Sequence, residues 1–379
     1  MSSICFVAGD PSGDLHAARL MAALKAKLPS LQMSGLGGPA MQAAGASLLD
    51  DLTKASAIGP FDASRYLGRF LRAKRLLAAH LDAHRPDLVV LVDFGDFNLP
   101  VVAPLVKRRG IPILYYISPQ LWAWGGFRMR LVRRYVDRMV VFFPFEERLY
   151  REAGVAVTWV GHPLVDEAKP TLTPERARER FDLNPWRRTV GLLPGSREHE
   201  IDRHLPLMLR AARHIAWHMP GVQFLLPKAP AVPLEALNRH LSRASLDVRV
   251  AAEGSVYDAL QLMDAAVVAS GTATLDAALS GVPMVVVYRA SWPTYAAARA
   301  VIRIPHIALV NVVAGRELVP ELVQRRATPG RVAAAMMALL RNEDRCVTIK
   351  EGLREVREKL GPPGAVDRAS DAVLQLLKK

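Results

Sequence analysis

Two short turns in the second half of the sequence combine glycine with hydroxyl, basic or acidic side chains, and each follows an apolar run. They contain Gly195, Ser196 and Arg197, then Ser270, Gly271, Thr272, Thr274 and Asp276. Glycine lets a ligand approach the backbone closely, and the start of a helix offers N–H groups with a partial positive charge. Arg197 adds a planar, permanently charged fork that suits phosphate oxygens. Two such turns predict a binding site for a nucleotide diphosphate.

Two carboxylates, Asp93 and Asp96, stand three residues apart directly after the apolar run 88–92. Beside an apolar wall, one of two neighbouring carboxyl groups can have a raised pKa and act as a general base. The alternative is a solvated loop in which Asp96 only caps the next turn. We favour the catalytic interpretation, because α/β sheets place their chemistry at the carboxyl ends of strands.

A third turn, residues 9–14, follows the first apolar run and leads into a helical pattern. It would present Ser12 and Gly13 to a ligand; alternatively, Ser12 and Asp14 only cap the helix. Both interpretations stay open on the sequence alone. The turn lacks the G-x-G-x-x-G pattern, so neither a nicotinamide nor a flavin cofactor is expected.

The loop after the run 113–117 carries two tryptophans, Trp122 and Trp124, together with a proline. Large indole rings in a loop are unfavourable unless they pack against something. The sequence therefore predicts either a platform for a substrate or packing between domains, and it does not separate the two.

Asn311 and Glu317 follow the run 307–310. An amide and a carboxylate at this place could read a nucleobase or ribose hydroxyls, or Glu317 could be a first-turn residue favoured by the helix dipole. His162 has no second histidine or cysteine nearby, and the pair His199 and His204 lacks the geometry of metal ligands. No metal site is expected.

Residues 58–77 interleave apolar and aromatic groups with positive charges. The patch comprises Phe61, Arg65, Tyr66, Arg69, Phe70 and Arg72. On an anionic membrane the apolar groups would insert and the arginines would meet lipid phosphates. The alternative is a helix packed on its own sheet with a solvated basic face. The density of cations favours the membrane interpretation.

The elements that must position these residues alternate between short β-branched apolar runs and amphipathic helical segments. The runs are residues 4–8, 88–92, 113–117, 139–143, 190–193, 224–226, 265–269 and 284–288. This alternation predicts an α/β protein with two doubly wound, Rossmann-like domains that face a cleft. The proline-rich and charged stretch 163–185 is the expected linker, which gives domains 1–167 and 168–362. The last segment, 363–379, would pack back on the first domain or on a partner chain in a homodimer, and the sequence leaves this open.

The net charge of the chain indicates which kinds of molecule it binds. The chain has 379 residues, with 50 Lys and Arg against 36 Asp and Glu, so its formal charge is +14. This excess favours polyanions such as anionic lipid or phosphorylated substrates. No nucleic-acid-binding motif accompanies it, so no nucleic acid is expected. Two cysteines, no signal-like start and no long apolar run predict a cytoplasmic protein that at most sits on a membrane face.

Taken in order, nine motifs resemble the lipid-A-disaccharide synthase family, bacterial glycosyltransferases with the two-domain B-type fold. They are residues 9–14, 37–41, 93–98, 118–124, 144–146, 161–163, 193–197, 270–276 and 311–317, which together span nearly the whole chain. The resemblance implies transfer of a 2,3-diacylglucosamine from UDP to the 6-hydroxyl of 2,3-diacylglucosamine 1-phosphate. It also implies inversion at the anomeric centre, no metal or other cofactor, and association with the inner face of the inner membrane.

The resemblance assigns roles to the residues above. Asp96 is the expected base, with Asp93 second. The UDP donor would contact Gly195, Ser196, Arg197, Ser270, Gly271, Thr272, Thr274, Asp276, Asn311 and Glu317. The acceptor and its lipid would contact Ser12, Gly13, Asp14, Asp62 and Trp122. The first domain would face the acceptor and the membrane, and the second would hold the UDP-sugar.

Two other functions compete with this one. The first is a transferase or epimerase of UDP-amino sugars with a soluble substrate, which shares the fold. The second is a non-catalytic paralogue that binds a nucleotide-linked lipid. The family usually carries glutamate where this chain has Asp10, Asp62 and Asp276, each one methylene shorter. Such changes affect contacts on a scale that matters for rate.

Overall fold

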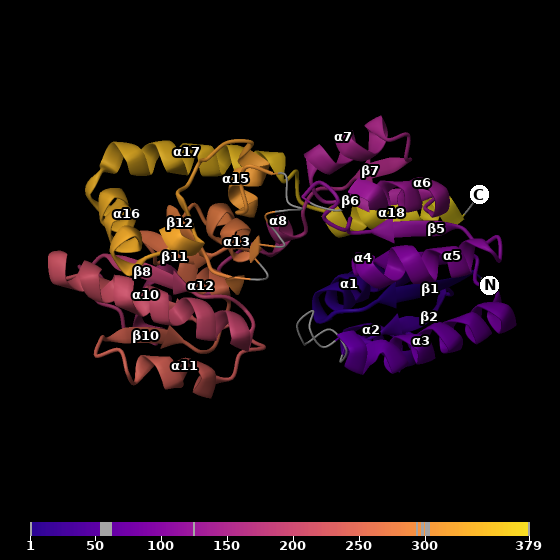
Figure 1. Ribbon diagram of the computed structural model, residues 1–379, viewed down its shortest axis with the longest axis horizontal. Coiled ribbons are helices and arrows are strands. Elements are labelled where there is room, and N and C mark those ends of the chain that lie inside the picture. The colour runs from indigo at the N-terminus through magenta and orange to yellow at the C-terminus, as the bar shows by residue number, and fades with distance from the viewer. Residues whose placement is uncertain are drawn as a thin grey trace. The chain divides into compact units, whose positions relative to one another are not determined.

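The computed structural model describes residues 2–53, 63–123, 126–292, 295–296, 299 and 304–377. Phe61 and Asp62, which the sequence assigned to the membrane patch and the acceptor site, lie outside these residues, and so do the side chains of Arg65 and Tyr66. The chain divides into two compact units (Figure 1). The first comprises residues 1–163 and 362–379, and the second comprises residues 164–361.

The first unit contains a seven-stranded parallel sheet in the order β3-β2-β1-β4-β5-β6-β7. Its strands are β1 Ser3–Ala8, β2 Gln32–Gly37, β3 Ser47–Asp51, β4 Leu88–Val92, β5 Ile113–Tyr116, β6 Arg138–Val141 and β7 Val157–Trp159. Its helices are α1 Pro11–Lys27, α2 Pro39–Ala43, α3 Ala63–His84, α4 Gly95–Phe97, α5 Ala103–Lys107, α6 Met129–Tyr135, α7 Pro144–Glu152 and α18 Ala365–Leu377. A π-helical turn, Asn98–Val102, joins α4 to α5. Alternate residues of the buried strands pack into two cores, one on each face of the sheet.

The second unit contains a six-stranded parallel sheet in the order β10-β9-β8-β11-β12-β13. Its strands are β8 Thr189–Leu193, β9 Gln223–Pro227, β10 Val248–Ala251, β11 Ala265–Ala269, β12 Met284–Tyr288 and β13 Glu321–Val323. Its helices are α8 Leu164–Glu167, α9 Pro174–Arg180, α10 Glu198–His218, α11 Leu234–Leu241, α12 Val256–Leu260, α13 Ala273–Leu279, α15 Leu309–Ala314, α16 Pro329–Arg341 and α17 Glu343–Lys359. Both sheets are doubly wound, as the sequence predicted.

The C-terminal helix α18 belongs to the first unit, where it packs on α1. Lys27 Nζ lies 2.7 Å from Asp371 Oδ1, and the Arg368 guanidinium donates to the Val160 carbonyl at 2.9 and 2.7 Å. In Figure 1 this yellow helix lies among the indigo and magenta elements of the first unit. The predicted linker 163–185 contains two short helices, α8 and α9.

Each sheet reverses its direction of winding at one place. In the first unit the reversal lies between β1 and β4, and in the second it lies between β8 and β11. Ligands of doubly wound sheets bind outside the carboxyl ends of the two strands at this reversal. Within the described part of the chain, no helix has the combined length and apolar character that crossing a bilayer requires.

Candidate active site

The predicted catalytic turn follows β4 at the reversal point of the first sheet, and its backbone is strained. Asp93 and Phe94 have φ values of 43° and 49°, in the left-handed region that bulky residues avoid. Tyr115 Oη and Asn98 Nδ2 hold the Asp93 carbonyl at 2.5 and 2.8 Å. The Phe94 ring covers Gly9 so closely that any side chain at Gly9 would clash with it. The turn is therefore held in a fixed conformation beside the end of β1.

Within this turn the Asp93 carboxyl group is poorly solvated. Burial raises its pKa from 3.8 to about 7, and the Asp10 carboxylate contributes more to this rise than the Asp96 carboxylate does. The backbone N–H of Phe94 partly offsets these effects. A carboxyl group with a pKa near 7 exchanges protons readily at neutral pH, which suits a general base.

Asp96 is in a different environment, although it lies three residues away. Its side chain is 71% exposed and forms an ion pair with Arg128, whose guanidinium is largely buried. Gly95 between the two aspartates packs against Pro119, where a side chain would clash. The structure thus separates a desolvated carboxyl group from a solvated, paired one.

The turn after β1 begins helix α1 and supports its neighbours. Asp10 caps α1 by accepting a hydrogen bond from the Gly13 N–H at 2.5 Å. Asp14 is buried, and its carboxylate accepts hydrogen bonds from the backbone of Gly38, Ala40 and Met41 at 2.8, 2.9 and 3.1 Å. Three N–H groups at the start of α2 thereby occupy Asp14. The Asp14 side chain thus fixes α2, and its predicted contact with the acceptor stays a prediction. Ser12 is exposed.

The predicted Trp122 platform lies in an aromatic cluster. The Trp122 ring packs edge-on against Phe145 at a centroid distance of 5.3 Å, and Phe145 stacks on Phe143 at 5.2 Å. Buried Glu146 accepts a hydrogen bond from the Phe143 backbone N–H at 3.2 Å, and burial raises its pKa to about 8. These contacts lie inside the first unit, so they account for the ring of Trp122 without packing between domains.

In the basic segment on α3, the structure describes the side chains from Gly68 onwards. Arg69 Nη2 donates to the Asp51 carbonyl at 2.5 Å, and Arg72, which is largely exposed, lies 3.8 Å from Asp50. Phe70 is partly buried against the rings of Phe94 and Phe97, at 6.0 and 5.3 Å. Much of the Phe70 surface therefore packs against the catalytic turn and is not available to lipid.

In the second unit, the first predicted phosphate turn follows β8. Gly195 has φ 130° and lies over Glu200, so only glycine fits there. The Glu200 carboxylate accepts hydrogen bonds from the N–H groups of Ser196 and Arg197 at 2.8 and 3.2 Å. It also lies 3.3 Å from the Arg197 guanidinium, which is mostly exposed. A carboxylate of the chain itself thus occupies the groups predicted to bind phosphate.

Buried His204 ties this turn to the loop after β12. Its Nδ1 lies 3.0 Å from the Pro194 carbonyl, and its Nε2 lies 3.2 Å from the Arg289 backbone N–H. The second contact requires Nε2 to accept, so Nδ1 carries the proton and the ring is neutral. Burial lowers the pKa of His204, which agrees with this assignment.

The second predicted turn follows β11 at the reversal point. Gly271 has φ 152°, and buried Thr274 donates its hydroxyl to the Gly271 carbonyl at 2.8 Å. Ser270 Oγ donates to the Ile307 carbonyl at 2.9 Å. Asp276 accepts a hydrogen bond from the Tyr257 hydroxyl at 2.6 Å, while burial raises its pKa to about 6. The turn is fixed by its own hydroxyl groups, and Thr272 is exposed at the start of α13.

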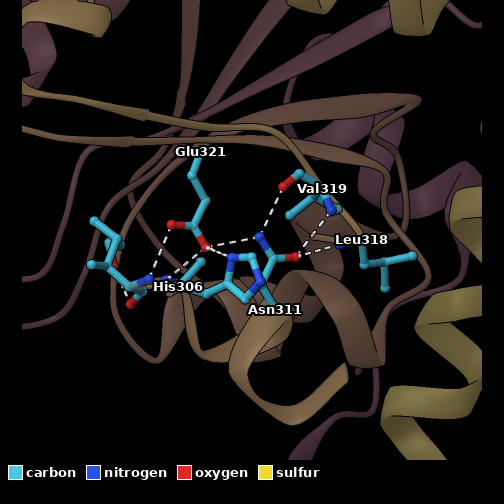
Figure 2. Close-up of polar contacts among 8 residues, drawn as sticks. His306, Asn311, Leu318, Val319 and Glu321 are labelled. Carbon is cyan, nitrogen blue, oxygen red and sulfur yellow. Dashed lines mark hydrogen bonds and ion pairs between the residues drawn. The ribbon is translucent and has the colours of Figure 1, made fainter. Parts of the chain in front are cut away.

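Asn311 lies at the centre of a polar network (Figure 2). Its Nδ2 donates to the Val319 carbonyl at 2.9 Å and to Glu321 Oε1 at 2.8 Å, and its Oδ1 accepts from the N–H groups of Leu318 and Val319 at 2.9 and 3.0 Å. The side chain is fully buried. These four bonds use the whole capacity of the amide. The amide therefore holds the surrounding backbone, and its predicted contact with a nucleobase stays a prediction.

Glu321 extends the network towards the second turn. Its carboxylate accepts from the N–H groups of Ile307 and Ala308 at 3.0 and 3.1 Å, and His306 Nδ1 lies 3.8 Å away. Figure 2 shows dashed lines from the Glu321 carboxylate to both His306 and Asn311. Because Ile307 also binds Ser270, one chain of hydrogen bonds connects Asn311 to the β11 turn. Glu317 is exposed outside this network.

Among the residues that the structure describes, no three His, Cys, Asp or Glu side chains are grouped so that they could hold a metal ion.

Comparison with known proteins places this arrangement in a family. The family described as lipid-A-disaccharide synthetase matches residues 4–375. The lipid-A-disaccharide synthase of Syntrophus aciditrophicus is 43% identical over 376 residues, which cover 99% of this chain and 98% of that protein. The chain belongs to the lipid-A-disaccharide synthase family. It is an enzyme, a glycosyltransferase of lipid A biosynthesis.

Solved structures agree with this family at the level of the fold. A calicheamicin glycosyltransferase, CalG4, aligns with a TM-score of 0.64 and 16% identity, covering 100% of this chain and 98% of that one. MnaA of S. aureus, solved with UDP, aligns with a TM-score of 0.66 and 13% identity over 100% and 98%. The chain therefore has the B-type glycosyltransferase fold. Other solved neighbours are UDP-N-acetylglucosamine epimerases, so the fold alone does not separate the two activities, whereas the family does.

Several residues that shape the site of this lipid-A-disaccharide synthase family member were missed from the sequence. They are Arg128, Glu200, His204, Tyr257 and Glu321. Glu200 had a local signal, since an acidic residue three positions into a helix pattern completes a capping box. The others are distant in sequence from the residues they contact, and no spacing rule identifies them.

Proposed function

We propose that this enzyme transfers a 2,3-diacylglucosamine from UDP to the 6-hydroxyl of 2,3-diacylglucosamine 1-phosphate. The products are the β-1′,6-linked disaccharide 1-phosphate and UDP. One observation carries the proposal: in a member of this family, the desolvated carboxyl group of Asp93 and the glycine turns at Gly195 and Gly271 all stand at the reversal points of the two sheets.

For the base we propose Asp93, with Asp96 second, which reverses the preference from the sequence. The base takes the proton from the 6-hydroxyl as its oxygen attacks the anomeric carbon. Asp93 supports this role by its burial and its pKa of about 7. Asp96 is exposed and paired with Arg128, so it is better suited to holding Arg128 at the site.

Attack forms the new C–O bond while the bond to the UDP oxygen breaks, and UDP leaves with that electron pair. Because the acceptor enters opposite the leaving group, the anomeric centre inverts. Arg197 and the backbone of residues 270–272 would stabilise the charge that develops on the diphosphate. These groups supply the positive charge without a metal, so we propose a metal-independent reaction.

The remaining proposed contacts are residues that the sequence assigned to the two substrates. Exposed Thr272, partly buried Asp276 and exposed Glu317 are proposed to contact the nucleotide, with Asp276 on the ribose hydroxyls. The solved neighbours that contain UDP or UDP-sugars support a nucleotide donor of this class. Ser12, Gly13, Asp62 and Trp122 are proposed to line the acceptor site.

Both substrates carry acyl chains, and we propose that the enzyme takes them from the inner face of an anionic membrane as a peripheral protein. Residues 58–77 would make the contact, with Arg72 among the exposed cations that the structure describes there. Changing Arg65, Arg69 and Arg72 to Glu should release the protein from anionic vesicles.

The test is direct synthesis. Purified protein is incubated in detergent with the UDP-linked diacylglucosamine and the monosaccharide phosphate, and disaccharide and UDP are measured by mass spectrometry. NMR of the product reports the anomeric configuration, and EDTA should leave the rate unchanged. Conversion of soluble UDP-N-acetylglucosamine without acceptor would favour an epimerase instead. Binding of UDP without turnover would favour a non-catalytic paralogue.

A further inference from the structure

Two tryptophans of the second unit are almost completely exposed. Trp186 is 93% exposed and Trp217 is 83% exposed, more than any other large hydrophobic side chain that the structure describes as exposed. An indole ring has a large apolar surface that gains free energy when it leaves water. Two bare indoles therefore indicate a surface that contacts another body.

Both rings lie at the same edge of the second sheet. Trp186 stands just before β8, and Trp217 stands in the last turn of α10, which leads to β9. Strands β8 and β9 are parallel neighbours, with Thr189 opposite Gln223 at their starts. The tryptophans thus lie at the amino ends of the strands. The glycine turns at Gly195 and Gly271 lie at the opposite, carboxyl edge.

The loop that carries Trp186 is held firmly against the end of α10. The Arg187 guanidinium donates to the carbonyls of Gly221 and Val222, both at 3.0 Å. The backbone N–H of Trp186 donates to Asn184 Oδ1 at 2.9 Å, and the Gln223 side chain binds the backbone of Asn184. These bonds hold the backbone that carries the exposed ring of Trp186.

A cavity of about 460 Å³ opens at this edge, and Trp186 forms part of its wall together with Ala216 and Phe224. Its two carboxylates, Asp182 and Asp247, are both paired with Arg249, at 2.9 and 3.6 Å. More of the accessible lining of the cavity is polar than apolar, and these two carboxylates leave no unpaired negative charge there.

The surroundings of the two rings are basic. Four exposed arginines border them: Arg187, Arg188, Arg213 and Arg341. Arg213 precedes Trp217 by one helical turn, so the two side chains share a face of α10. Arg341 donates to the carbonyl of His218 at 3.2 Å, and Arg188 binds the carbonyl of Leu340. These bonds keep positive charge beside the end of α10.

We propose that this edge of the second unit, defined by Trp186, Trp217 and the four arginines, is a contact surface for an anionic lipid bilayer. Indole rings favour the headgroup level of a membrane, where their apolar bodies insert and their N–H groups stay hydrated. Arginines around them meet lipid phosphates. The formal charge of +14 favours an anionic occupant over a neutral protein surface. The surface is separate from residues 58–77, and it does not depend on the proposed reaction.

The full-length chain is mixed with vesicles of phosphatidylcholine and phosphatidylglycerol, or of phosphatidylcholine alone, and sedimented without substrates. The double variant Trp186→Ser, Trp217→Ser should lower partitioning into anionic vesicles about tenfold. Arg213→Glu should lower it roughly fivefold or more, and only on anionic vesicles. Trp292→Ser is the matched control, since Trp292 is also exposed but follows β12 at the carboxyl edge. Its partitioning should equal that of the unchanged protein.

A second measurement does not depend on the variants. In brominated anionic vesicles the tryptophan fluorescence of the unchanged protein should be quenched, and most of that quenching should disappear in the double variant. Turnover of detergent-dispersed substrates should stay the same, because neither ring lies near the candidate site. Equal sedimentation of the double variant and the unchanged protein would overturn the proposal. So would a change in oligomeric state on light scattering with unchanged vesicle binding, because the surface would then join copies of the chain.

Discussion

The Glu200 carboxylate lies 2.8 Å from the backbone nitrogen of Ser196, at the start of α10 where a phosphate group is expected. The same carboxylate lies 3.3 Å from the Arg197 guanidinium. Glu200 therefore fixes the turn, but its negative charge stands close to where the donor diphosphate would bind. Its two effects, capping and repulsion, can be separated by substitution.

We expect Glu200→Gln to bind UDP more tightly, by roughly fivefold, because removing a like charge a few ångströms away is worth about 1 kcal/mol in a water-like medium. Glutamine keeps an oxygen that can accept from the turn. Glu200→Ala removes the cap as well and should lower the free energy of unfolding by about 1 kcal/mol. Calorimetric titration with UDP and thermal denaturation measure the two effects. Weaker UDP binding by Glu200→Gln would mean that the charge orients Arg197.

The two aspartates of the catalytic turn should differ in their effect on rate. Asp93→Asn removes the proposed base and should lower kcat by about 10²–10⁴-fold, with little change in UDP affinity. Asp96→Asn removes only an exposed ion pair with Arg128, so its loss should be much smaller. Steady-state kinetics and UDP titration of both variants distinguish the roles. A greater loss in Asp96→Asn would restore Asp96 as the base.

The pH dependence of the reaction should reflect the environment of Asp93. The base works when deprotonated, and its pKa is about 7, so kcat/KM should rise with pH through about 7. Asp10→Asn removes the nearby charge that raises this pKa most after burial, so the midpoint should move to lower pH. Asparagine keeps an oxygen to cap α1. Asp96→Asn should shift the midpoint in the same direction by less. If the pH midpoint of kcat/KM were identical in the unchanged protein, Asp10→Asn and Asp96→Asn, Asp93 would be excluded as the titrating group.

Much of the fold could be predicted because buried parallel strands are continuous apolar runs, as in residues 88–92 and 265–269. Strands β3, β10 and β13 were missed. They form sheet edges, and their short, polar sequences give little signal. β2 was missed as well, because its two glycines interrupt the apolar pattern.

The location of the candidate site followed from topology, since residues after the strands at a reversal must meet at one edge of a sheet. The partners of each side chain did not follow. The sequence suggested that Asn311 and Asp14 bind ligands, yet each is hydrogen-bonded to groups that only the folded chain brings together. The Asp93 carboxyl group is also poorly solvated and Asp96 exposed, and their spacing of three residues did not indicate this difference.

The network around Asn311 should support both the stability of the second unit and the binding of the UDP donor. Asn311→Ala would leave the N–H groups of Leu318 and Val319 buried without a partner, and each such group costs about 1–3 kcal/mol. We therefore expect a loss of about 3 kcal/mol or more in the free energy of unfolding of the second unit. UDP binding should weaken too, because Ile307, held by Glu321, positions Ser270. Urea denaturation with and without UDP measures both.

Glu321→Gln tests the same network with less disruption. It keeps the shape of the side chain but loses the charge that accepts from Ile307 and Ala308, so UDP affinity should fall while most of the stability remains. Arg316→Ala is the control from the same loop, since its ion pair with Glu355 is exposed and should contribute about 0–1 kcal/mol. If Asn311→Ala were as stable as Arg316→Ala and bound UDP normally, the four hydrogen bonds of this amide would not support the donor site.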